Sequence, residues 1–169
     1  TLSLHDALPI SWRFADKVGA NCYLMAAPIF APDKAIHDGL MNHPGIVEVC
    51  RRAEQLDLAI VSVGHLNPGS TLAGLEVLDQ DTLDALQKAG AVGDFFCRFI
   101  DKDGQPIDHP INDRVVAVDM ASVRAAKKKI LASGGAQKKL GVAASLKVVK
   151  PMVLITDETV ADYLMTPDA

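Results

Sequence analysis

The sequence predicts an α/β protein in which a parallel sheet is sandwiched by helices, as in Rossmann-like folds. Hydrophobic residues make up 49% of the 169 residues and aromatic residues only 5%, so Val, Leu, Ile and Ala must build the core. These residues are typical of strands buried between helices. In the last third of the chain, a strand, a helix, a second strand and a second helix follow one another. This order requires parallel strands joined by a right-handed crossover.

The first eleven residues, TLSLHDALPIS, are predicted to be foreign to the fold. Thr1 to Ile10 can be read back through the genetic code as ACT CTT TCC CTA CAC GAC GCT CTT CCG ATC, which matches a common sequencing adapter. We therefore interpret residues 1–11 as a translated adapter and exclude them from the fold, as one would exclude a tag. The alternative is a native N-terminal segment closed by Pro9. On the first interpretation, residues 12–169 are one partial domain that has lost elements upstream.

The elements in the first half of the chain are predicted from apolar spacing and turn residues. Residues 20–30 form an apolar run ended by prolines, which indicates a buried strand leading into a loop. Residues 44–56 have apolar positions at steps of three and four and a proline in the first turn, which indicates a helix. Residues 58–64 are predicted to be a central parallel strand, and residues 80–89 a helix ended by Gly90.

The second half continues the same alternation. An extended pattern over residues 92–101 is followed by a turn and crossing segment, a strand over residues 114–120, and a short helix over residues 121–129. Lys127, Lys128 and Lys129 are expected at the C-terminal end of that helix, where its dipole favours cations. The closing unit is predicted as a strand over 129–133, a Gly-rich turn opening a helix over 134–147, a strand over 152–156 and a helix capped by Asp157.

Composition excludes several classes of function. The net charge is −4 and the basic residues are scattered apart from the lysine cluster, so no duplex-binding face is predicted. No run approaches the ~18 apolar residues that a membrane span needs. Cys22, Cys50 and Cys97 are odd in number and lie in apolar stretches, which favours free thiols in the reducing cytoplasm.

Motifs for common chemistries are absent from the sequence. The histidines have no metal-ligand spacing, so neither a metal nor any other cofactor is predicted. The chain contains no G-x-S-x-G elbow, no Walker loop and no G-x-G-x-x-G fingerprint.

Candidate binding residues are those that follow strands, because ligands of parallel α/β sheets bind beyond the carboxyl ends of the strands. Gly134, Gly135 and Lys138 could form an anion cradle in which backbone amides and one amine hold a phosphate. The alternative is an ordinary turn with a solvated lysine. Asp94 could accept two sugar hydroxyls, or could serve a local turn or helix.

Three further positions have a structural interpretation that competes with a functional one. Arg114 could bind an anion with its planar fork, although a surface pair with Asp113 is the commoner explanation. Asp157 is expected chiefly to cap a helix. Ser70 and Thr71 could line a pocket, but a plain loop is the simpler interpretation.

Four segments together resemble a known family. These are APIFAPDKAIHDGLMNHPGIVEVCRRAEQLDLAIVSVGHL, LQKAGAVGDFFCRFIDKDGQPIDHPINDRVVAV, SGGAQKKLGVAASLK and VLITDETVADYLM. In this order they are similar to the effector domain of the SorC family of bacterial transcriptional regulators, also called SorC/DeoR-like, from about Tyr23 to Met165. The resemblance implies a fold like that of ribose-5-phosphate isomerases and CoA transferases.

The resemblance also implies partners and roles. Members carry an N-terminal helix-turn-helix that binds operator DNA and a larger domain that binds a phosphorylated sugar and controls dimer or tetramer assembly. Lys138 and the Gly134–Gly135 turn would contact phosphate or sugar, and Asp94 would face the hydroxyls; Arg114 and Asp157 transfer less directly. The helix-turn-helix and the first strand of the effector domain would lie upstream of Trp12, outside this chain.

The sequence therefore predicts the sugar-phosphate effector domain of a regulator of carbohydrate metabolism, without catalysis. One alternative is an enzyme of the related isomerase or deaminase type, for which Asp94 is the only candidate general base. Another is a purely structural or oligomerisation domain.

Overall fold

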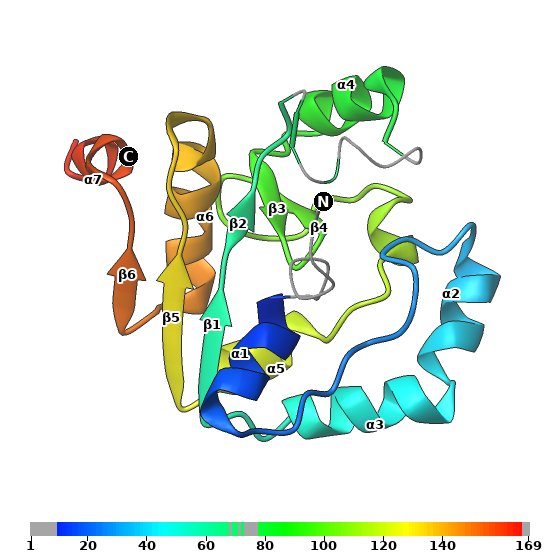
Figure 1. Cartoon of the computed structure of the whole chain (residues 1–169). Helices are drawn as coiled ribbons and strands as arrows, with labels where there is room; N and C mark the ends of the chain where they lie inside the picture. Colours follow the sequence, from blue (N-terminus) through cyan, green and yellow to red (C-terminus); the bar gives the residue numbers. More distant parts are fainter. Residues whose placement is uncertain (1–9, 68, 71, 73–77, 167–169) are drawn as a thin grey trace, which may run out of the picture.

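The strands form two small sheets, and residues 58–64 run from the first sheet into the second (Figure 1). The computed structural model describes residues 10–67, 69–70, 72 and 78–166. The parallel sheet has the order β1-β5-β6, with β1 at Leu58–Val61, β5 at Lys128–Ala132 and β6 at Val153–Ile155. The antiparallel sheet has the order β2-β3-β4, with β2 at Val63–Gly64, β3 at Gly93–Phe95 and β4 at Arg98–Ile100. Only Ser62 separates β1 from β2, so the chain passes directly from one sheet into the other.

Helices fill the connections, and aspartates cap several of them. The α-helices are α1 Ile10–Val18, α2 Lys34–Met41, α3 Pro44–Ala53, α4 Gln80–Lys88, α5 Met120–Ala125, α6 Lys139–Val149 and α7 Glu158–Leu164. The chain also forms two short 3₁₀ helices. One, η1 at Asn112–Arg114, lies between β4 and α5, and the other, η2 at Ala136–Lys138, leads into α6. Side chains of Asp33, Asp79, Asp119 and Asp157 accept N–H groups from the first turns of α2, α4, α5 and α7. These bonds satisfy donors that a helix start leaves without an intrahelical partner.

The closing β5-α6-β6-α7 unit is confirmed, with β5 and β6 parallel. Residues Val142, Ala144 and Val149 of α6 are buried in the same apolar cluster as Val61 of β1 and Leu131 of β5. The helix approaches the antiparallel sheet very closely at Gly141. A Cβ there would lie 2.7 Å from Val63 Cγ1, so only glycine allows this packing. Because α6 begins at Lys139, the contact also brings Lys138 to the end of β2.

Two predicted strands are wrong, and a third is misplaced. Residues 20–29 and 116–118 have no strand structure, and only an isolated bridge joins Phe30 to Val115. An apolar run becomes a strand only when a neighbour supplies a continuous ladder of hydrogen bonds. Around this bridge the described residues supply only two, from the Val116 N–H to the Ile29 carbonyl and from the Ala31 N–H to the Arg114 carbonyl. The 58–64 run forms two strands, β1 and β2, in different sheets, and β5 rather than β1 is central in the parallel sheet.

The lysine cluster is divided between two elements. Lys128 and Lys129 belong to β5 rather than to the preceding helix. Lys129 Nζ nevertheless donates to the carbonyl of Arg124 at 2.8 Å, so a cation does neutralise the C-terminal end of α5.

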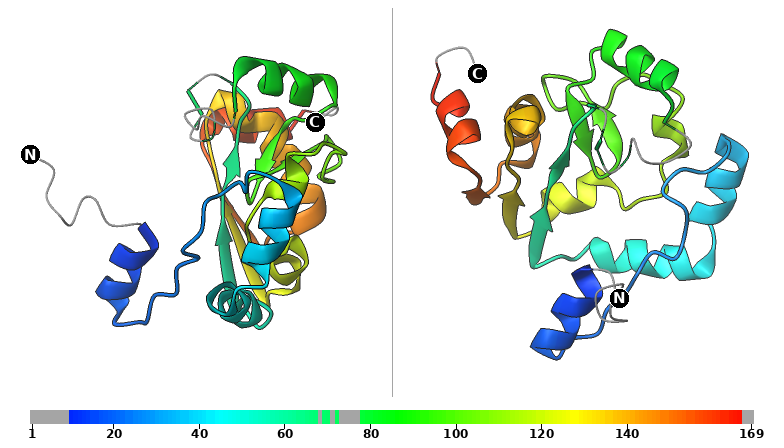
Figure 2. Two further views of the ribbon diagram at one scale, coloured as in Figure 1. Left: turned by 90° about the vertical axis from the view of Figure 1, so that its right-hand side faces the viewer. Right: turned by 45° about the horizontal axis from the view of Figure 1, so that its top comes forward.

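The two faces of the parallel sheet differ. Figure 2 shows α5 and α6 on one side, with α1 projecting on the other. Leu58, Ile60, Val153 and Ile155 are exposed. Among the described residues, no helix is long and apolar enough to cross a membrane.

Candidate functional site

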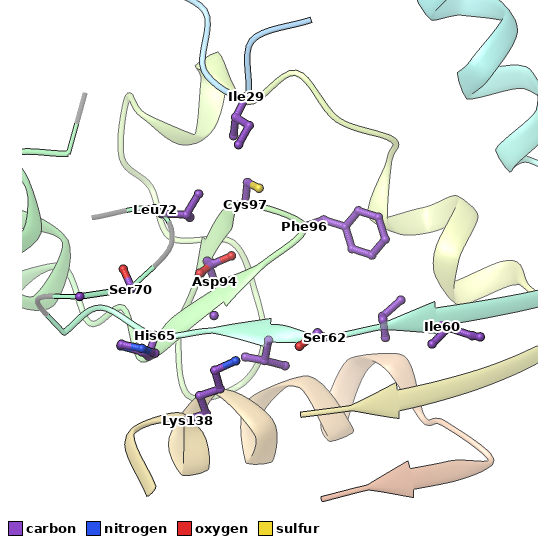
Figure 3. A pocket seen from close by; sticks show the side chains of 14 residues that line it. Ile29, Ile60, Ser62, His65, Ser70, Leu72, Asp94, Phe96, Cys97 and Lys138 are labelled. Carbon is purple, nitrogen blue, oxygen red and sulfur yellow. The ribbon is translucent and has the colours of Figure 1, made fainter. Parts of the chain in front are cut away.

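A cavity of about 460 Å³ lies where the chain leaves β1, passes through β2 and enters the following loop (Figure 3). Its wall comes from four segments: residues 60–65, the loop at Gly69, Ser70 and Leu72, the β3–β4 hairpin, and Lys138 of η2, with Ile29 at the rim. The volume suits a small organic ligand. It lies beyond the carboxyl end of a parallel strand, the place where such folds bind ligands.

Asp94 is the buried acid of this cavity. It lies on β3, is only 8% exposed and points into the hollow (Figure 3). Burial raises the pKa of its carboxyl group to about 6, although the backbone N–H of Cys97 and the charge of Lys138 both act to lower it. A shift of this size means that ionised Asp94 costs the fold about 3 kcal/mol, at 1.36 kcal/mol per pKa unit. A buried carboxyl group at this cost, in a cavity, favours a functional role.

One glycine makes room for that carboxyl group, and a second allows close packing on the other face of β3. Gly64 pairs with Asp94 across β2 and β3, and a Cβ on Gly64 would overlap the Asp94 carboxylate. A Cβ on Gly93 would lie 2.8 Å from the carbonyl oxygen of Gly64 and 3.2 Å from Cα of Gly141. The Asp94 carboxyl group therefore rests against the bare backbone of Gly64, whereas Gly93 lets β3 pack closely on β2 and α6.

The turn beside Asp94 has an unusual backbone. Phe96 and Cys97 connect β3 to β4, and both have positive φ values, 53° and 60°. A two-residue hairpin turn of this kind ordinarily has the sequence Asn-Gly, because residues other than Gly, Asn and Asp are strained at positive φ. The turn aims the Cys97 N–H at Asp94 and brings the side chains of both turn residues to the cavity wall. Such strain is typical of functional sites.

Lys138 and His65 form the basic part of the cavity. Lys138 is half-buried, and its amine reaches the end of β2 from the side opposite to Asp94 (Figure 3). His65 directly follows β2 and is also half-buried. Burial lowers the pKa of its imidazole, and the charge of Lys138 lowers it further. One cavity thus offers a cation and a neutral ring on one side and a carboxyl group on the other.

The structure does not bring the Gly134–Gly135 turn to this cavity. The backbone N–H of Gly135 donates to the carboxylate of Asp157, which also accepts the Val160 N–H. A Cβ on Gly134 would likewise meet the Asp157 carboxylate. The predicted cradle is therefore occupied by the protein's own acid, and Lys138 is the part of it that reaches the cavity. The predicted capping role of Asp157 is confirmed.

Arg114 also lies outside the described cavity wall. Its Nε donates to the carbonyl of Ala31 at 2.7 Å, and its own carbonyl accepts from the Ala31 N–H at 2.8 Å. These bonds join the end of η1 to the segment before α2, which is a structural task. They differ from the predicted surface pair with Asp113.

The loop after β2 contributes more than the sequence indicated. Ser70 is 8% exposed and lines the cavity, whereas Thr71 lies outside the described residues. Sequence reasoning missed His65, Phe96 and Cys97 as wall residues. The one available signal for His65 was its position immediately after a strand. In the described part of the chain, no three His, Cys, Asp or Glu residues gather as a metal site would need.

Comparisons with known proteins identify the domain. The family model described as "Putative sugar-binding domain" matches residues 4–166. The chain is 26% identical over 161 residues to the erythritol catabolism regulatory protein EryD of Brucella abortus, covering 95% of this chain and 50% of that protein. It is 30% identical over 120 residues to the deoxyribonucleoside regulator of Bacillus subtilis, covering 71% of this chain and 38% of that protein.

Solved structures share the fold. A DeoR family transcriptional regulator from Listeria monocytogenes has a TM-score of 0.83 at 23% identity, covering 91% of this chain and 62% of that one. The full-length sorbitol operon regulator SorC from Klebsiella pneumoniae has a TM-score of 0.77 at 22% identity, covering 92% and 50%. The chain spans half or less of the length of the curated relatives EryD and the deoxyribonucleoside regulator. Because the family model covers nearly all of its residues, the chain belongs to the sugar-binding domain family of DeoR/SorC-type regulators.

Proposed function

We propose that this chain is the effector-binding part of a transcriptional regulator of carbohydrate metabolism, and that its cavity binds a phosphorylated sugar. Asp94 accepts the sugar hydroxyls, and Lys138 holds the phosphate. The observation that carries this proposal is the costly buried carboxyl of Asp94 in the same cavity as the Lys138 amine. A carboxylate accepts two hydroxyl groups at once, and a lysine amine provides charge-assisted bonds to an anion.

The names of the relatives support a sugar or a related compound as the ligand. The relatives are named as regulators of erythritol catabolism and of the sorbitol operon and as a deoxyribonucleoside regulator. The proposal that the sugar carries a phosphate depends on Lys138 alone, because the Gly135 N–H already donates to Asp157.

Regulation requires more than binding. The ligand must have different affinities for two arrangements of the subunits, so that its binding shifts the population between them. We propose that this chain acts in the cytoplasm within a homo-oligomer, as part of a longer protein. Operator DNA is contacted by a helix-turn-helix outside residues 12–169. The sequence of the complete protein tests this arrangement directly, because it must contain that helix-turn-helix.

The competing function is catalysis, because a carboxyl group with a pKa of about 6 could act as a general base. The regulator names of the relatives favour binding without turnover. We interpret the raised pKa as the consequence of burying a sugar-binding acid.

The test is a panel of sugar phosphates and the corresponding free sugars, added to the purified chain. Thermal stability and product formation are followed in the same samples. Stabilisation by one or more sugar phosphates without product supports an effector-binding domain. Product formation supports the enzyme, and the absence of any response across the panel contradicts both.

A further inference from the structure

His65 is the cavity residue whose role the proposed function leaves unassigned. It follows Gly64 at the end of β2 and lines the cavity with Lys138 and Asp94 (Figure 3). Its Nδ1 accepts the backbone N–H of Asn67 at 3.2 Å. The ring is therefore fixed at one nitrogen by the loop that forms the cavity wall.

That bond determines where the ring carries its proton. Because Nδ1 acts as an acceptor, the proton of the neutral imidazole must lie on Nε2. The charged groups that line the cavity with His65 are Lys138 from η2 and Asp94 from β3, and Lys138 together with burial lowers the pKa of the ring. The neutral form with Nε2–H therefore prevails at neutral pH. Nε2 makes no hydrogen bond to any residue that the structure describes.

Two other histidines make the same local bond without a cavity. His43 Nδ1 accepts the Gly45 N–H at 3.2 Å, and His109 Nδ1 accepts the Ile111 N–H at 3.3 Å. In all three cases the partner is two residues further along, so this bond is a recurring way of shaping a turn. It uses only Nδ1. Neither His43 nor His109 is among the described residues of the cavity wall, so the placement of the His65 ring in the same cavity as Lys138 needs a separate explanation.

We propose that His65 is a ligand-contacting residue whose Nε2–H donates a hydrogen bond to the same anionic group that Lys138 holds. This inference rests on the proposed function and extends it. Lys138 supplies the charge, and His65 supplies a directed neutral donor that is held in place by Asn67. A second cation would add repulsion, whereas a neutral N–H adds an oriented bond to a phosphate oxygen.

The arrangement also orients the ligand. The anionic group binds between Lys138 and His65, and the hydroxyl-bearing carbons extend toward Asp94 on the other side of β2. A sugar with a phosphate at one end and free hydroxyls at the other fits this polarity. A free polyol offers hydroxyl oxygens as acceptors but no negative charge to pair with the Lys138 amine.

Two variants of His65 separate the roles of the two ring nitrogens, and a third variant, at His109, is the control. His65→Asn keeps an acceptor close to the Nδ1 position and removes the Nε2 donor, whereas His65→Gln places an amide N–H close to Nε2. His109→Asn is the matched control, because its Nδ1 has the same kind of backbone partner away from the cavity wall. Calorimetric titration uses the most stabilising sugar phosphate of the panel, and unfolding of the ligand-free proteins checks that each variant is folded.

The expected result is about tenfold weaker binding by His65→Asn, the loss expected from one hydrogen bond to a charged group. His65→Gln should retain most of the affinity, and His109→Asn should match the parent. Imidazole NMR of the parent should show the His65 Nε2 signal moving when inorganic phosphate is added, while that of His109 does not.

Each contrary outcome has a distinct meaning. If His65→Asn is folded and binds as tightly as the parent, while Lys138→Ala loses affinity, the role of His65 is wrong and the proposed function stands. If the parent binds no sugar phosphate, the proposed function fails and this inference fails with it.

Discussion

Gly64 and Asp94 are neighbours across β2 and β3, and the carboxylate of Asp94 occupies the space that a side chain at residue 64 would fill. Gly64→Ala should therefore displace the carboxylate and destabilise the fold by about 1–3 kcal/mol, the usual cost of overpacking. Sugar-phosphate affinity should fall as well. Urea unfolding and calorimetric titration measure the two effects.

A second glycine provides the control for this substitution. Gly39 lies in α2 with nothing within 4 Å of an added Cβ, so Gly39→Ala should stabilise the chain by about 0.5–1 kcal/mol. If Gly64→Ala behaves like Gly39→Ala, the described contact between Gly64 and Asp94 is wrong.

Asp94 should make stability depend on pH. Its pKa is about 6 in the folded protein, compared with the ordinary aspartate value of 3.8 that we take for the unfolded chain. The folded state therefore binds the proton more tightly. The corresponding stability is complete below pH 3.8 and is lost as the pH rises through about 6. Asp94→Asn removes the ionisation and keeps an acceptor for the Cys97 N–H. At pH 8 the variant should be more stable than the parent by up to about 3 kcal/mol, and at pH 4 the difference should nearly vanish.

The measurement is urea unfolding of both proteins at several pH values, taken as the difference between them so that other titrating groups cancel. The same variant should bind sugar phosphates more weakly, because an amide accepts fewer hydroxyl groups than a carboxylate. A constant stability difference from pH 4 to pH 8 would show that Asp94 is not a buried ionising acid.

At position 97 a glycine should make the protein more stable than an alanine does, which reverses the usual order of stability. Because its φ is 60°, a residue with a Cβ is strained there by about 1 kcal/mol or more. Cys97→Gly should therefore unfold at a higher urea concentration than Cys97→Ala, although glycine is normally the less stable of the two. The opposite order would mean that the turn between β3 and β4 does not have this backbone.

Asp157 should matter for stability and not for binding. It caps α7 and accepts the Gly135 N–H, and Asp157→Ala removes both bonds. The expected loss is about 1–2 kcal/mol of unfolding free energy, with Asp157→Asn retaining much of it. Affinity for the sugar phosphate should stay within twofold of the parent, because Asp157 lies outside the cavity wall. A tenfold loss of affinity in a folded Asp157→Ala protein would restore the Gly134–Gly135 turn as a ligand contact.

The sequence predicted the parts of the fold that depend on local pattern. The β5-α6-β6-α7 unit follows from apolar runs, a glycine turn and a capping aspartate close together in the chain. Asp94 and Lys138 were selected because they follow or open elements at the binding edge of such a sheet, and the structure places both in one cavity.

Features that depend on distant partners were not predictable in this way. The Gly135 amide is bound by Asp157, which lies 22 residues further along the chain, and no local pattern reveals that bond. Phe96–Cys97 lacks the Asn-Gly signal of a tight hairpin, so residues 92–101 looked like one extended segment. Residues 20–30 have the composition of a strand, but in the described part of the chain they pair only at the isolated bridge between Phe30 and Val115.

The central claim is that Lys138 and Asp94 bind opposite ends of a phosphorylated sugar, and one ratio tests it most directly. Calorimetry gives the affinity for a sugar phosphate divided by that for the corresponding free sugar, in the parent and in Lys138→Ala. We predict a preference of about tenfold or more in the parent, as expected for a charge-assisted bond, and its disappearance in the variant with residual binding of the free sugar. An unchanged ratio in a folded Lys138→Ala protein would contradict the account.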